Sequence, residues 1–188
     1  MRSQILVPLI SLAVAAQVCC CCTMLGGPQP PYAIAPSDAA VQRFEERMNS
    51  VDTGANNSFT ITITEEEMTS LVVRQMSKQE NPPPISEPQV HFRNGRVEFY
   101  ATVQFAESLA LPGLVAFSIT AVGGKVEVSV EEIALGPLPI PQSMLESLTD
   151  MINQTLTQNI QVDGAEAIIT EVQIADGEMR ISGEPASD

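Results

Sequence analysis

The 188-residue sequence predicts an α+β domain in which a curved antiparallel sheet wraps a long amphipathic helix, preceded by an N-terminal membrane-anchor segment. Three observations lead to this prediction. Runs of alternating apolar and polar residues are joined by turn dipeptides such as Asn94-Gly95, which is typical of antiparallel hairpins. Residues 141–159 carry a wide apolar stripe at helical spacing. Arg2 is the only charged side chain among the first 27 residues.

The N-terminal segment is long and apolar enough to anchor the chain in a membrane. Residues 5–27 contain no charge, and a spanning helix needs roughly 20 apolar residues. Arg2 favours a cytoplasmic N-terminus, with the rest of the chain outside the cell membrane. Three readings stay open: an uncleaved signal anchor, a lipoprotein signal with a lipid-modified cysteine on the outer face, or cleavage near residues 13–15. The lipidation candidates are Cys19, Cys20, Cys21 and Cys22.

These four cysteines are the only ones in the chain, so the rest of it is expected to fold without disulfides. Adjacent cysteines cannot converge on one tetrahedral metal ion, and we predict no metal and no cofactor. The domain organisation that follows is a signal anchor or lipoprotein signal over 1–27, a Pro-rich linker over 28–36, the α+β domain over 37–184 and a tail over 185–188. The linker is expected to be extended and to hold the domain clear of the membrane.

The first half of the domain contains two predicted helices and a strand. Ser37 is placed to cap a helix over about 38–50, and Phe59, Ile61 and Ile63 alternate with threonines in a half-buried strand. A capping box from Thr64 to Glu67 starts a second helix over about 65–79. The apolar face of that helix comprises Met68, Leu71, Val72 and Met76.

Four or so antiparallel strands follow. Apolar residues alternate over 90–92, 97–105, 115–121 and 126–130, and a change of parity near Glu131 and Glu132 predicts a β-bulge. Pro141 suits the first turn of the long helix over about 141–159, and a hairpin around Asp176-Gly177 closes the domain. The predicted apolar stripe of the long helix comprises Met144, Leu145, Leu148, Met151, Ile152 and Leu156.

Charge and composition exclude several classes of function. The chain has 23 acidic and 9 basic residues, a net charge of −14, which argues against nucleic-acid binding. His91, the only histidine, lies on the strand face opposite Val90 and Phe92, so it is expected to face solvent rather than to act as a general base. Glu65, Glu66 and Glu67 are explained by helix capping rather than by a metal site. We therefore predict that the chain is not an enzyme.

Two sequence segments resemble small bacterial envelope proteins of the YpmS and LmeA type. These are the strand-then-helix opening at residues 59–68 and the approach at residues 135–141 to the long helix. Those proteins resemble halves of tubular lipid-binding (TULIP-like) domains. The resemblance covers about residues 37–184 and implies a long helix lying in the concavity of a curved sheet. Lipid binding in these families is itself inferred from the fold, so it enters here by analogy.

The leading functional hypothesis is a membrane-tethered extracytoplasmic domain that binds a lipid or another hydrophobic molecule without catalysis. The alternative is a structural or protein-interaction module of the cell envelope whose core is closed. The methionines on the helical faces, among them Met68 and Met76, are predicted to be core rather than an adaptable ligand lining. The candidate ligand-lining residues are Met144, Leu148, Met151, Ile152, Phe99, Phe117, Ile119 and Ala121.

Overall fold

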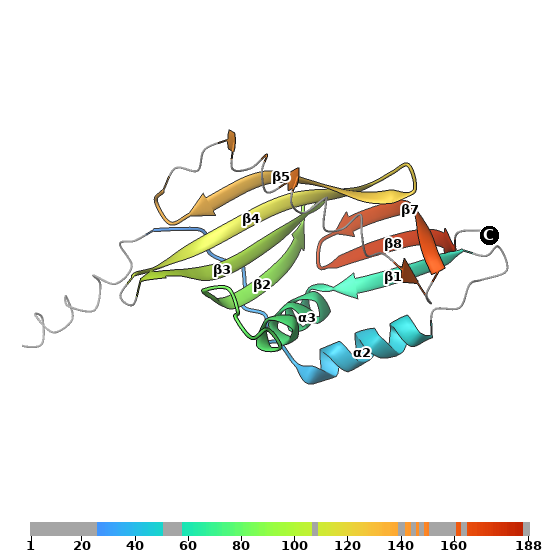
Figure 1. The fold of residues 1–188 in the computed structure, drawn as a ribbon, viewed down its shortest axis with the longest axis horizontal. Helices are drawn as coiled ribbons and strands as arrows, with labels where there is room; N and C mark the ends of the chain where they lie inside the picture. Colours follow the sequence, from blue (N-terminus) through green and yellow to red (C-terminus); the bar gives the residue numbers. More distant parts are fainter. Residues whose placement is uncertain are drawn as a thin grey trace, which may run out of the picture.

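The computed structural model describes residues 26–50, 58–106, 109–138, 161–162 and 165–185, together with the single positions 142, 143, 146, 149 and 150. The mixed α+β class and the antiparallel pairing are confirmed (Figure 1). The predicted long helix over 141–159 lies largely outside the described residues, although those five single positions are helical. The described elements are α2 (Asp38–Asn49), β1 (Phe59–Thr64), α3 (Glu65–Ser77), β2 (Ile85–Arg93), β3 (Arg96–Ala106), β4 (Leu109–Val122), β5 (Lys125–Leu135), β6 (Gln161–Val162), β7 (Ala165–Ala175) and β8 (Glu178–Pro185).

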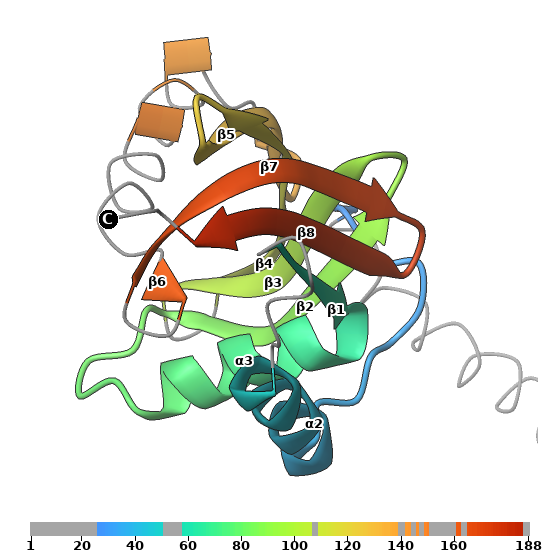
Figure 2. The same ribbon diagram turned by 90° about the vertical axis from the view of Figure 1, so that its right-hand side faces the viewer.

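The strands form two antiparallel sheets of four strands each. One has the order β2-β3-β4-β5 and the other the order β1-β8-β7-β6. The sheets meet where their hairpins touch. The backbone N–H of Ile169 donates to the carbonyl of Gly124 at 2.8 Å, and the N–H of Gly177 donates to that of Phe92 at 3.0 Å. Figure 1 and Figure 2 show β7 and β8 beside the β2-β3-β4-β5 sheet, with α3 and α2 along one side.

The predicted turns and the predicted bulge are confirmed. Asn94 and Gly95 both have positive φ angles, of 53° and 77°, as a tight hairpin turn requires. In the pairing of β4 with β5, Ala116 lies opposite Glu132 but Phe117 lies opposite Val130. Glu131 is therefore the extra residue of the bulge.

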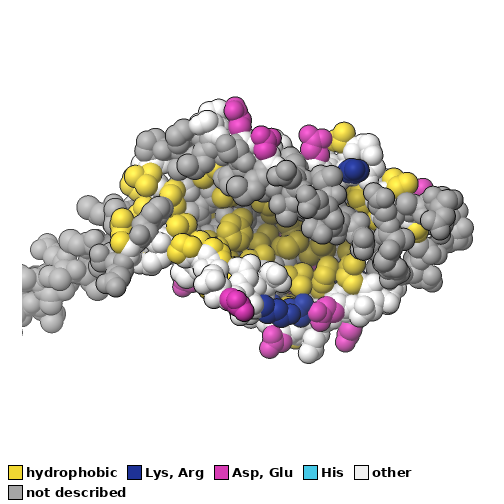
Figure 3. Space-filling view, viewed as in Figure 1, with side chains coloured by type: hydrophobic (Ala, Val, Ile, Leu, Met, Phe, Trp, Pro, Cys, Tyr) yellow, Lys and Arg dark blue, Asp and Glu magenta, His cyan; other side chains and the backbone are white. Residues whose placement is uncertain are grey.

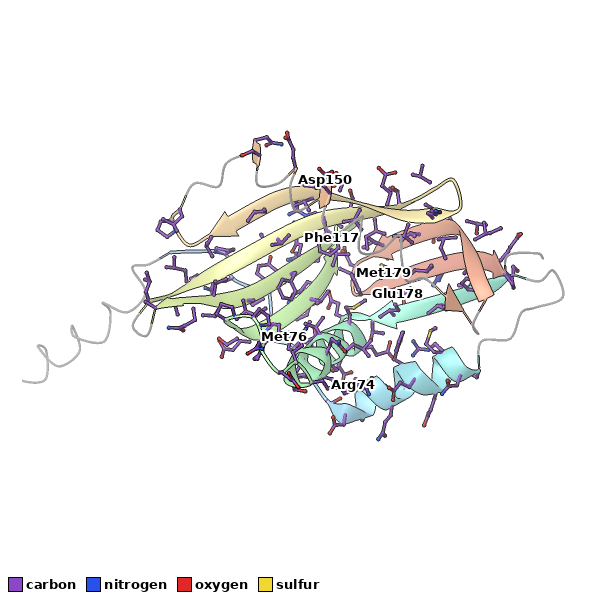
Figure 4. All side chains as sticks on the ribbon, viewed as in Figure 1. Arg74, Met76, Phe117, Asp150, Glu178 and Met179 are labelled. Carbon is purple, nitrogen blue, oxygen red and sulfur yellow. The ribbon has the colours of Figure 1, made fainter. Side chains whose placement is uncertain are left out.

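The main hydrophobic core lies between the two sheets and α3. In Figure 4, Phe117 of β4 and Met179 of β8 lie close together at its centre. Its partly buried neighbours include Phe99, Phe117, Ile119 and Ala121, four residues that alternation alone places on one face. The buried members of this core are Phe59, Ile61, Ile63, Val90, Phe92, Val97, Ala167, Ile169 and Met179.

Side chains at the start of α3 both cap the helix and protect the edge of β2. Thr64 accepts from the Glu67 N–H, and Glu67 accepts from the Thr64 N–H, which confirms the predicted capping box. The Val90 N–H donates to Thr69 Oγ1 at 2.9 Å, and the Phe92 N–H donates to Glu65 Oε1 at 2.8 Å. These two bonds satisfy backbone donors at a strand edge that would otherwise be open to pairing with another chain.

Residues 26–37, called the N-terminal strap below, lie against the domain. The strap is extended, as predicted, but it is not a free spacer. Tyr32 donates its hydroxyl to the Glu65 carboxylate, and the Ile34 N–H donates to Gln89 Oε1 at 3.1 Å. At its end, Ser37 accepts from the Ala40 N–H and caps α2, as predicted. The segment therefore packs along the domain, because its polar groups bond to β2 and α3, and the distance between the domain and its anchor stays a prediction.

Candidate functional site

The best candidate for a binding site is an apolar groove on the β2-β3-β4-β5 sheet, bounded at one end by α3 and by Met179 of β8. It consists of two adjoining hollows of about 230 and 240 Å³, both bounded by Phe99. The space-filling view shows hydrophobic side chains gathered in this hollowed centre (Figure 3). The first hollow is lined by Met68, Val72, Val90, Phe92, Val97, Phe99, Phe117, Ile119 and Met179. The second is lined by Ile85, Phe99, Ala101, Val103, Gly113, Leu114, Val115, Ile133, Ala134 and Leu135.

The groove lining is chemically uniform. None of its described residues carries a charged or polar side chain. A polar ligand would lose its hydration there without gaining hydrogen bonds from side chains, whereas an apolar ligand would lose nothing. The arrangement can therefore hold a hydrocarbon group, and its described residues offer no side chain for acid–base chemistry.

Three of the lining residues predicted from the sequence lie on the wall of this groove. They are Phe99, Phe117 and Ile119. Ala121 is not among the described residues that line the two hollows, although it packs against the main core together with Phe99, Phe117 and Ile119. The other candidates, Met144, Leu148, Met151 and Ile152, lie outside the described residues, as do the lipidation candidates Cys19 to Cys22.

Several lining residues are not among the candidates that the sequence predicts. Met68 of α3 was predicted to be core, and it both packs against the main core and lines the first hollow. Met179 comes from the other sheet, so only the tertiary arrangement brings it to the groove. Val103 and Val115 belong to the same alternating faces as Phe99 and Phe117. Strand parity could have identified these two, and it could not have identified Met179.

A second cluster lies on the opposite side of β2 and β3, beneath the N-terminal strap. His91 is fully buried there, so the prediction of a solvent-facing histidine is wrong. Its ring makes edge-to-face contacts with Tyr32 and Tyr100, whose ring centroids lie at 4.8 and 5.5 Å. Glu98 is buried beside it and accepts a hydrogen bond from the Tyr100 hydroxyl. The strap, together with Tyr100, covers a strand face that alternation marks as polar.

Burial and charge shift the proton equilibria of this cluster. Burial lowers the pKa of His91 below its ordinary 6.5, although the carboxylates of Glu65 and Glu98 oppose that shift. Burial and the hydrogen bond to Glu98 raise the pKa of Tyr100 to about 12. The hydrogen bond to Glu65 raises the pKa of Tyr32. At neutral pH the histidine is uncharged and both phenols are protonated, so neither tyrosine is activated as a nucleophile.

The two ring nitrogens of His91 have no hydrogen-bond partner among the described residues. Leaving a buried imidazole without partners is costly, and the adjacent Glu65 carboxylate already accepts from Tyr32 and Phe92. Across the described part of the chain, no group of three or more His, Cys, Asp and Glu residues is placed to hold a metal ion. The same part contains no helix that is both long and apolar enough to span a bilayer.

Comparison with known proteins adds no relative. No protein-family model matches the chain, and none of the curated proteins is significantly similar to it.

Proposed function

We propose that this chain is tethered to a membrane through its N-terminal segment and binds a hydrophobic molecule, a lipid acyl chain in the first instance, in the apolar groove. The observation that carries the proposal is the uniform apolar lining of the two hollows around Phe99. Neither hollow alone reaches the roughly 300–1,000 Å³ of a small-molecule site, but the two together lie within that range. Sequestration of an apolar ligand requires no catalytic group.

The finer architecture belongs to the same proposal. We infer that the β2-β3-β4-β5 sheet curves around the helix expected over 141–159, and that the ligand lies between them. One contact of the described residues supports this placement. The Val130 N–H of β5 donates to Thr149 Oγ1 at 3.1 Å, which brings that position to the edge of the sheet. The apolar stripe of the helix, with Met144 and Leu148, would then complete the lining.

Photolabelling of the full chain in membranes tests the proposal. The chain is reconstituted into phosphatidylcholine vesicles that contain a small fraction of phosphatidylcholine with a diazirine at the end of one acyl chain. After irradiation, the labelled positions are identified by mass spectrometry at residue level. We expect labels at Phe99, Val103 and Val115, besides those in the N-terminal segment.

The two parts of the proposal are read out separately. Labels confined to residues 1–27 would support the tether and reject the groove as an acyl-chain site. Labels at Val103 that persist after Val115→Phe fills the groove would also reject it, because labelling would then not depend on the cavity. The absence of any label within residues 5–27 would reject the tether.

A further inference from the structure

We propose that one end of the domain rests directly on the bilayer surface. This end, called the membrane pole below, comprises residues 26–28, 109–112 and 135–138. The inference rests on the tether of the proposed function but not on a ligand in the groove. It reverses the expectation from sequence that a stiff linker holds the domain at a distance.

The first argument is the position at which the N-terminal strap enters the fold. A side chain at Gly27 would collide with Pro112 and with the backbone of Gly136, so the chain passes tightly between these residues. Figure 1 shows the strap, in blue, starting at the end of the sheet where β4 begins and β5 ends. From there to Ser37, the contacts of Tyr32 and Ile34 hold it on the domain.

The strap therefore leaves almost no chain between the membrane and the domain. The N-terminal segment predicted to anchor the chain ends at Gly27, where the proline-rich stretch begins, and Gly27 is already packed against the fold. If the anchor is instead a lipid on one of Cys19 to Cys22, the five to eight residues from there to Gly27 reach at most about 18 to 29 Å when fully extended. In either case the membrane pole is the part of the domain nearest the bilayer.

The second argument is the scarcity of charge at this end. The segments that meet at the membrane pole are 26–37, 109–124 and 133–138, and none of them contains a charged residue, although the whole chain has 23 acidic ones. Among the described residues, the exposed Glu87 of β2 lines a hollow beside the pole together with Pro28 and Pro112. Glu107, in the connection between β3 and β4, lies outside the described residues. Acidic side chains are repelled by anionic lipid headgroups. The membrane pole is thus a part of the surface where few acidic side chains oppose the approach to a bilayer.

The third argument is the exposure of two large apolar side chains at the same end. Leu109 is 42% exposed and Leu138 is 48% exposed. Leu138 is held by the turn after β5, where its N–H donates to the Leu135 carbonyl and the Gly136 N–H donates to the Pro112 carbonyl. Apolar side chains fixed in an exposed position next to a membrane anchor are suited to insertion at the level of the lipid headgroups.

The chain contains no tryptophan, so a single introduced tryptophan reports on one position. Leu109→Trp and Leu138→Trp place it at the membrane pole. Val122→Trp is the matched control, since Val122 is 54% exposed and lies at the other end of β4, roughly 40 Å from Leu109 for an extended strand. Val14→Trp reports on the anchor. Each full-length variant is reconstituted into phosphatidylcholine vesicles with brominated acyl chains, and fluorescence quenching is measured.

We expect quenching and a blue-shifted emission for Val14→Trp, Leu109→Trp and Leu138→Trp, and several-fold weaker quenching for Val122→Trp. Quenching at Val14 combined with control-level quenching at both leucines would overturn the membrane pole and leave the tether standing. Equal quenching at Val122 and Leu109 would also overturn it. No quenching at Val14, in a chain whose intact mass shows residues 1–27 present and no lipid on Cys19 to Cys22, would reject the tether and the membrane pole together. If the leucine variants do not fold, photolabelling of the unmodified chain decides, because the inference requires labels at Leu109 and Leu138.

Discussion

The imidazole of His91 lies 3.7 Å from the carboxylate of Glu65, measured from Nδ1 to Oε1, without a hydrogen bond between them. The carboxylate is occupied by two other donors, the Tyr32 hydroxyl and the Phe92 N–H. Glu65 thus joins three elements, the N-terminal strap, α3 and β2. The histidine fills the space behind this junction as an uncharged aromatic ring.

This geometry predicts an acid-sensitive fold. Burial lowers the folded-state pKa of His91 below 6.5, against the opposing effect of Glu65 and Glu98 and with a smaller contribution from Arg93. Above pH 6.5 the residue is neutral in both states. As the pH falls below 6.5, the unfolded chain takes up a proton that the folded chain does not, so stability is lost until the pH reaches the folded-state pKa.

His91 is the only histidine, so its ring C–H resonances can be followed by NMR without ambiguity. We expect a titration midpoint below 6.5 in the folded protein. We also expect His91→Phe to reduce the loss of unfolding free energy between pH 7.5 and pH 5.5. A midpoint at or above 6.5 would contradict the burial described here.

The contacts of the N-terminal strap predict that Tyr32→Phe destabilises the structure locally, within the strap. The substitution keeps the ring contact with His91 and removes the hydrogen bond to Glu65. A hydrogen bond to a charged group contributes about 1.5–3 kcal/mol at most, and less here because Tyr32 is half exposed. Hydrogen exchange should become faster over residues 32–37 and stay unchanged in β4. Thr60→Val, which removes an exposed hydroxyl contact with Ser182, is the control and should leave the strap unaffected.

The capping box predicts a larger and less local effect for Thr64→Ala. Loss of an N-cap costs about 0.5–2 kcal/mol. The bond lost is the one from the Glu67 N–H to Thr64 Oγ1, and the buried Glu67 carboxylate of the same capping box also pairs with Arg47 at 2.6 Å. The loss of unfolding free energy, measured by denaturant unfolding, should lie in the upper half of that range. A loss no greater than that of Thr60→Ala, on the same strand, would show that the helix start does not depend on the cap.

Substitution by alanine should affect the unfolding free energy differently at Gly183 and at Gly113, although the sequence does not distinguish these two glycines. A Cβ at Gly183 would lie 2.6 Å from both the Ile168 carbonyl oxygen and the Phe59 ring, whereas one at Gly113 would meet its nearest atoms at 3.4 Å. Gly183→Ala should therefore destabilise the fold by about 1–3 kcal/mol through overpacking. Gly113→Ala should change the unfolding free energy far less. Equal effects in denaturant unfolding would contradict this packing.

Local signals explain why so much of the sheet could be predicted. The turn at Asn94-Gly95 requires positive φ angles that these two residues adopt readily. The bulge at Glu131 follows from a change of parity within one strand. Such features depend on residues adjacent in the chain, and the structure confirms them. The same parity placed Phe99, Phe117 and Ile119 on one face.

The failures have a common physical origin in contacts between distant parts of the chain. His91 was expected to face solvent because its strand alternates, but Tyr32, 59 residues earlier, covers it. The strap was expected to be a spacer because of its prolines, and no local pattern shows that Ile34 bonds to Gln89.

A substitution that fills the groove distinguishes the lipid-binding hypothesis from the alternative of a closed core. Val115 is half buried on the wall of the second hollow, and Thr120 is exposed on the opposite parity of the same strand. If the groove is open to an acyl chain, Val115→Phe should abolish photolabelling at Val103 and change the unfolding free energy by less than about 1 kcal/mol. Overpacking of a closed core would cost about 1–3 kcal/mol. Thr120→Phe adds the same ring outside the groove and should preserve labelling. A destabilised Val115→Phe, combined with no labelling of the unmodified chain at Val103, would favour the interaction module over the lipid-binding domain.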